Sequence, residues 1–123
     1  MFRSIILVGI GGGIGSIIRY LTAVYVQKNF TTLFPWATFV ANITGCLIIG
    51  LLLGLSEKYN LIGSDMKFLF ITGFCGGYTT FSTFMADNVT LIENGQMPIA
   101  FLNIALSILA GLAATWLGLW MIR

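Results

Sequence analysis

The sequence predicts an all-α integral membrane protein with four transmembrane helices. Of its 123 residues, 58% are hydrophobic and only 8% are charged, and there is no histidine. Apolar runs long enough to cross a bilayer, at about 20 residues per helix, occupy most of the chain. Turn-forming residues gather in three short connectors between these runs. We therefore expect a single transmembrane domain over residues 1–123, with little room for a soluble one.

The connectors set the expected helix boundaries. They read KNFTTLFP, EKYNLIGSD and ENGQMP, and they divide the chain into helices at about 4–27, 36–56, 67–92 and 97–121. An even number of helices places both termini and the middle connector on one side of the membrane. The few charged residues form no run of like sign, which argues against a nucleic-acid partner.

The first helix combines glycine-rich packing positions with one charged residue at membrane depth. Three pairs of small residues stand four apart, which favours close helix contact in lipid: Gly9 with Gly13, Gly11 with Gly15, and Gly12 with Ser16. Arg19 lies within the same helix. Its long side chain either extends to the membrane surface or supplies a vestibule charge that attracts anions, and the sequence favours neither.

The second and fourth helices each carry polar residues at membrane depth. Asn42 is the only amide side chain of the second helix, and it either bonds another helix or lines a pore as a donor. In the fourth helix a polar or small residue recurs at every fourth position, at Asn103, Ser107, Gly111 and Thr115. That stripe either lines water or contacts a helix.

The third helix is predicted to break near residues 76–80, within GFCGGYTTFSTFM. Gly76 and Gly77 weaken a helix, and the hydroxyl residues after them compete for backbone hydrogen bonds. Non-helical backbone at membrane depth survives only against protein or a cavity, where its freed carbonyl oxygens can bind an ion. The alternative is a kink in a continuous helix.

Two phenylalanines follow the predicted break. Phe81 and Phe84 are three residues apart and share one helix face, flanked by Ser82 and Thr83. The edge of a phenyl ring is positive and attracts a small anion, whereas the ordinary role of such a pair is contact with lipid or core. Four helices enclose too little space for a pore, so a second copy of the chain is expected.

These segments resemble the small fluoride channels called Fluc or CrcB. The likeness extends through GGGIGSIIRY, TFVANITG and, most specifically, GFCGGYTTFSTF. The resemblance implies an antiparallel, dual-topology homodimer in a bacterial inner membrane, with two fluoride pathways and a central structural sodium ion.

The resemblance also implies residue roles. The sodium ligands would be the backbone carbonyls of Gly76 and Thr79, and Arg19 would be a vestibule or structural charge. The fluoride pathway would be lined by Asn42, Phe81, Ser82, Thr83, Phe84 and Thr115. Met85, Asp87 and Asn103 depart from the family's usual residues, which leaves the far end of the pathway undefined.

The expected function is passive export of fluoride from the cytoplasm. A proton-coupled exporter of the small multidrug resistance type is an alternative. Its mechanism resembles a proton relay on a glutamate of the first helix, but residues 4–27 contain no acidic side chain. A non-transporting assembly subunit is a second alternative. Nothing in the sequence supplies acid-base or covalent chemistry, so an enzyme is not expected.

The distribution of lysine and arginine conflicts with dual topology. The side that holds the termini collects Arg3, Lys58, Lys67 and Arg123, whereas the other side has Lys28 and Arg19 at most. By the positive-inside rule this bias favours cytoplasmic termini, although insertion in both orientations requires almost no bias.

Overall fold

A computed structural model describes residues 1–60 and 63–123, and every regular element in these ranges is helical. Three helices are long and apolar enough to cross a membrane. They are α1 (Phe2–Asn29), α2 (Trp36–Lys58) and α6 (Met97–Ile122). α1 extends the predicted helix by two residues at each end, whereas α2 and α6 begin where predicted and end two residues and one residue later. The chain is a multi-pass membrane protein.

The remaining span is divided into four pieces. α3 (Ser64–Met66), the π-helix η1 (Lys67–Cys75) and α4 (Gly76–Tyr78) run on from one another, and α5 (Ser82–Glu93) follows after a break. Thr79 has extended backbone, with φ −88° and ψ 157°. The sequence therefore correctly predicts a broken third helix, although the π-helical winding of η1 was not anticipated.

The break lies slightly later in the chain than predicted. Gly76 and Gly77 are helical, and the non-helical residues run from Thr79 to Phe81. Gly77 packs against the backbone of Gly12 in α1, where an added Cβ would overlap the Gly12 carbonyl. This glycine therefore serves close helix contact, and the unwinding falls to the threonines that follow.

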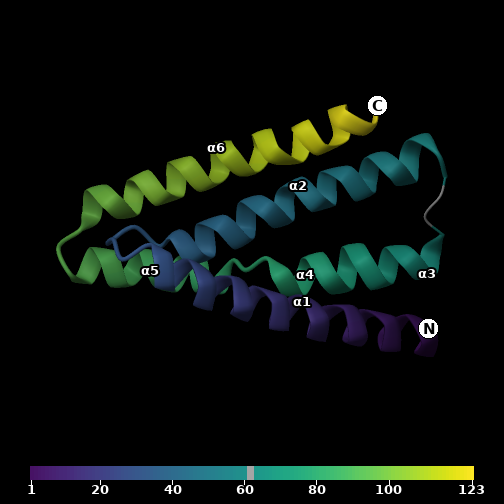
Figure 1. Ribbon diagram of the computed structural model, residues 1–123, viewed down its shortest axis with the longest axis horizontal. Helices are drawn as coiled ribbons and strands as arrows, with labels where there is room; N and C mark the ends of the chain where they lie inside the picture. Colours follow the sequence, from purple (N-terminus) through teal and green to yellow (C-terminus); the bar gives the residue numbers. More distant parts are fainter. Residues whose placement is uncertain (61–62) are drawn as a thin grey trace.

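The four spans form two neighbouring pairs (Figure 1). α2 packs along α6, and α1 packs along η1 and α4. The N- and C-termini lie at the same end of the molecule, together with the connector between α2 and α3, as an even number of spans requires. Two ion pairs lie at this end, Arg3 with Asp65 at 2.8 Å and Arg123 with Glu57 at 3.0 Å.

Glycines determine how closely these pairs approach. An added Cβ at Gly11 or Gly15 would overlap backbone atoms of the third span, whereas Gly9 and Gly13 have open space beside them. Gly50 and Gly118 make equally close contacts between α2 and α6. The predicted role of the small residues in tight packing is confirmed, and in α1 the Gly11 and Gly15 pair carries it.

Candidate ion pathway

Asn42 satisfies the backbone of the broken segment. Its Nδ2 donates to the carbonyl oxygen of Thr80 at 3.0 Å, and its Oδ1 accepts from the Thr80 N–H at 2.8 Å. An unpaired N–H or C=O at this depth would cost about 1–3 kcal/mol each. Asn42 is therefore an interhelical hydrogen-bonding residue, and it also lines a cavity described below.

Three further side-chain hydrogen bonds hold the ends of the break. Arg19 Nε donates to the carbonyl oxygen of Gly77 at 3.0 Å, across 58 residues of sequence. Thr79 Oγ1 donates to the carbonyl oxygen of Cys75 at 2.8 Å. The N–H of Thr83 donates to Thr80 Oγ1 at 3.2 Å, which supports the first turn of α5. The broken backbone is thus fixed by side chains of α1, α2 and its own threonines.

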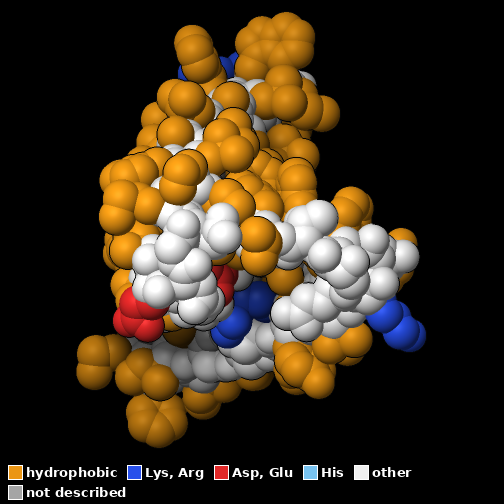
Figure 2. Space-filling model, turned by 90° about the vertical axis from the view of Figure 1, so that its left-hand side faces the viewer, with side chains coloured by type: hydrophobic (Ala, Val, Ile, Leu, Met, Phe, Trp, Pro, Cys, Tyr) orange, Lys and Arg blue, Asp and Glu red, His pale blue; other side chains and the backbone are white. Residues whose placement is uncertain are grey.

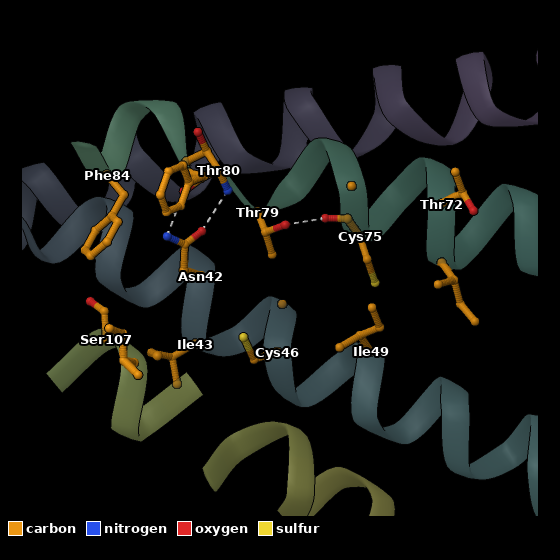
Figure 3. A pocket seen from close by; sticks show the side chains of 15 residues that line it. Asn42, Ile43, Cys46, Ile49, Thr72, Cys75, Thr79, Thr80, Phe84 and Ser107 are labelled. Carbon is orange, nitrogen blue, oxygen red and sulfur yellow. Dashed lines mark hydrogen bonds between the residues drawn. The ribbon is translucent and has the colours of Figure 1, made fainter. Parts of the chain in front are cut away.

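A mostly apolar cavity of about 500 Å³ lies beside the break, between the third span and α2. Figure 3 shows Asn42, Cys46 and Ile49 of α2 facing Thr79, Cys75 and Thr72 across it, with Phe84 and Ser107 at one end. Gly76 and Phe81 complete the part of the lining that matters here. Predicted pathway and sodium residues therefore surround one space.

A second cavity, of about 340 Å³, is polar and lies at the end of the molecule opposite the termini. Its lining includes Arg19, Asp87, Thr38, Thr83 and, shared with the apolar cavity, Thr80. Figure 2 shows basic and acidic side chains within a hollow on this face. Arg19 therefore lines this cavity and also donates to the break, so its side chain is directed into the protein.

The two phenylalanines differ in exposure. Their ring centroids are 6.2 Å apart with the planes tilted by 55°. Phe84 is buried at 7% exposure, whereas Phe81 is 73% exposed in the single chain. Both line the apolar cavity, so the cavity wall at Phe81 is exposed on its outer side in the single chain.

The other predicted pathway residues lie in different surroundings. Ser82 is exposed at the start of α5, and Thr83 lines the polar cavity. Thr115 lies elsewhere, where its carbonyl closely approaches Gly50 of α2. The stripe on α6 divides accordingly, because Ser107 reaches the apolar cavity and Gly111 packs against Cys46.

Two polar contacts were not predicted from the sequence. Thr38 Oγ1 of α2 donates to Asp87 Oδ2 of α5 at 2.7 Å, within the polar cavity. Asn103 Nδ2 of α6 donates to Asn88 Oδ1 of α5 at 2.9 Å. The four-residue spacing of Thr38 and Asn42, and of Phe84 and Asn88, puts each pair on one helix face, but it does not identify the partner on the other helix.

Comparison with known proteins shows the family. Residues 6–119 match the family model described as "CrcB-like protein, Camphor Resistance (CrcB)". A "Fluoride-specific ion channel FluC" of Flavobacterium psychrophilum is 52% identical over 95% of this chain and 94% of its own length. Proteins of that name from Azobacteroides pseudotrichonymphae and Phocaeicola vulgatus are 46% and 40% identical, over 96% and 97% of this chain and 94% and 98% of their own lengths. These matches confirm the resemblance read from the sequence: the chain belongs to the CrcB-like family.

Proposed function

We propose that this protein is a fluoride-selective channel that lets fluoride leave the cytoplasm passively. The observation that carries the proposal is the pair of adjoining cavities at the broken third span, in a chain whose relatives are named fluoride-specific ion channels. Such relatives are channels and not enzymes, in agreement with the sequence-based expectation.

The two cavities suggest the order in which an anion meets the protein. The polar cavity presents Arg19, whose cation attracts anions from water. Thr80 borders both spaces, so its hydroxyl lies where an ion would leave the vestibule. Beyond it, the positive edges of Phe81 and Phe84 and the amide of Asn42 are the groups suited to a small, partly dehydrated anion.

A second copy of the chain is part of the proposal. Phe81 is largely exposed although it belongs to the cavity wall, and four helices enclose too little space for a complete pore. We propose an antiparallel homodimer with two fluoride pathways. The bias of lysine and arginine toward the terminal side opposes this orientation under the positive-inside rule, so the orientation needs a direct test.

The residues proposed to bind a structural sodium ion are suited to it. The Thr80 N–H donates to Asn42, so it does not close a helical turn onto the carbonyl of Gly76. Gly76 and Thr79 both border the apolar cavity, and carbonyl oxygens are the ligands a hard cation prefers. Gly76 and Thr79 of each copy would hold the ion, which would supply positive charge that stabilises the broken backbones of the pair.

The rival functions fit less well. A proton-coupled exporter of the small multidrug resistance type would need an acidic residue in the first helix as its proton relay, and α1 contains none. An assembly subunit would have no use for the apolar cavity beside the break. Passive flux is therefore the mechanism we propose.

The proposal is tested by ion efflux from liposomes that contain the purified protein. We expect rapid release of fluoride and none of chloride, measured with ion-selective electrodes under the same potassium gradient and ionophore. Protein-free liposomes are the control. Equal release of both anions would contradict selectivity, and release of neither would contradict the channel itself.

A further inference from the structure

A chain of three polar side chains connects the interior of the α5–α6 contact to the apolar cavity. Ser107 Oγ donates to Asn103 Oδ1 at 3.1 Å, and Asn103 Nδ2 donates to Asn88 Oδ1 at 2.9 Å. Asn88 and Asn103 are 3% and 1% exposed, whereas Ser107 lines the cavity. The chain of hydrogen bonds therefore has one buried end and one end at the proposed ion pathway.

The buried end holds an unused donor. Among the residues that the structure describes, Asn88 Nδ2 has no hydrogen-bond partner, and it is the one buried side-chain nitrogen or oxygen in that condition. A buried amide N–H without a partner is costly, although Asn88 Oδ1 also accepts the hydrogen bond of the buried Asn103 amide. Asn88 therefore holds one donor that the present hydrogen bonds do not use.

At the other end of the chain of hydrogen bonds, the Ser107 hydroxyl proton is not available to the cavity. A serine hydroxyl has a single proton, and Ser107 donates it inward to Asn103 Oδ1. Figure 3 shows Ser107 at the same end of the cavity as Phe84. In this arrangement Ser107 offers an anion in the cavity only lone pairs, which repel it.

Rotation of the Asn88 and Asn103 amides exchanges donor and acceptor in both hydrogen bonds without moving the heavy atoms apart. A half-turn of an asparagine amide exchanges its oxygen and nitrogen, which have nearly the same size and position. Asn88 Nδ2 would then donate to Asn103 Oδ1, and Asn103 Nδ2 would donate to Ser107 Oγ, while Asn88 Oδ1 would become the unpaired atom in place of Nδ2. The contacts of 2.9 and 3.1 Å both stay within hydrogen-bond range.

We propose that Asn88 and Asn103 are positioning residues that reverse together and thereby free the Ser107 proton to bind an anion in the cavity. The unused donor of Asn88 is the group that the reversed chain requires. Without an anion the inward direction satisfies the Ser107 proton, and with one the outward direction does. The proposal rests on the proposed function, because it takes the anion to be fluoride.

The direct test is solid-state NMR of the liposome-reconstituted protein with 15N-labelled asparagine side chains. Spectra are compared in sodium fluoride and in sodium gluconate, and Asn88→Leu and Asn103→Leu identify the two signals. We expect fluoride to shift the side-chain 15N signals of both residues in the wild-type chain. In Ser107→Ala these shifts should disappear, while the signal of exposed Asn29 is unaffected throughout.

Fluoride efflux supplies the second measurement. Ser107→Ala should lower flux about tenfold, as expected for loss of a hydrogen bond to a charged group. Ser107→Thr, which keeps the hydroxyl, should restore it. Asn88→Leu removes the acceptor of Asn103 Nδ2 and so favours its donation to Ser107 Oγ; it should raise flux in the wild-type background and have no effect in Ser107→Ala, because the two residues act through one proton.

The outcomes separate this inference from the function beneath it. If wild-type liposomes release fluoride but Asn88 shows no anion-dependent shift, the relay is wrong and the channel stands. An equal effect of Asn88→Leu in both backgrounds also overturns the relay, since it marks a purely structural residue. If wild-type liposomes release no fluoride, both proposals fail.

Discussion

The two faces of the broken third span are built in opposite ways. The face toward α1 is packed backbone against backbone, with Gly11 and Gly15 against Leu69, Phe74 and Tyr78. The face toward α2 borders a cavity of about 500 Å³ and touches Asn42 through hydrogen bonds. One face leaves no space for a methyl group, and the other leaves space for an ion.

This difference shows how a small membrane protein can hold an unwound segment in place. Close packing on α1 fixes the helix that leads into the break, because interiors at this density do not deform continuously. The open face then needs only a few directed hydrogen bonds to position Thr80. We therefore expect changes on the packed face to act on folding, and changes on the open face to act increasingly on flux.

The largest effect is expected from filling the packed face. In Gly15→Ala the new Cβ would overlap backbone atoms of Phe74, which cannot move aside as a side chain can. We expect the free energy of unfolding to fall by about 3 kcal/mol or more. In size-exclusion chromatography and thermal unfolding in detergent, most of the protein should be aggregated or unfolded. Gly13→Ala, with open space beside it, is the matched control, and equal damage in both variants would contradict the packed face.

The next largest effect is expected where the open face touches the break. Asn42→Leu leaves the N–H and C=O of Thr80 unpaired, at about 1–3 kcal/mol for each group. The thermal unfolding temperature should fall, and fluoride efflux should be nearly abolished in the protein that remains folded. Asn29→Leu removes an exposed asparagine that bonds only within α1 and should leave both measurements unchanged. Wild-type efflux in Asn42→Leu would show that the segment holds itself.

The sequence predicts the packed and open faces unequally. Long apolar runs and their connectors identify the four spans because a bilayer imposes their length. Asn42 and Arg19 can be selected because polar groups at membrane depth need partners. The position of the break is harder to predict, because a glycine such as Gly77 is equally expected where a helix unwinds and where α1 approaches closely. Contacts between distant segments, such as Thr38 with Asp87, depend on helix rotation and are not set by local spacing.

A smaller effect, confined to flux, is expected from the aromatic wall of the open face. Phe81→Ile and Phe84→Ile keep the apolar volume and remove the positive ring edge, so the assembly should persist. Fluoride efflux should fall about tenfold, the factor that corresponds to an aromatic contact of about 1.4 kcal/mol. Phe101→Ile is the control, because Phe101 is exposed on α6 away from the cavity lining. Unchanged efflux in both cavity variants would remove the aromatic-edge mechanism.

The smallest effect is expected at Arg19, where the packed α1 meets the polar cavity. Arg19→Gln removes the positive charge from the vestibule, whereas Arg19→Lys keeps it, although both lose the guanidinium contact with Gly77. If the charge concentrates anions, Arg19→Gln should lower fluoride efflux about threefold at low ionic strength, and an impermeant salt should shrink that difference as it screens the field. Arg19→Lys should stay near wild type at every salt concentration. An equal, salt-independent loss in both variants would instead show that Arg19 affects flux through its hydrogen bond to the Gly77 carbonyl and not through its charge.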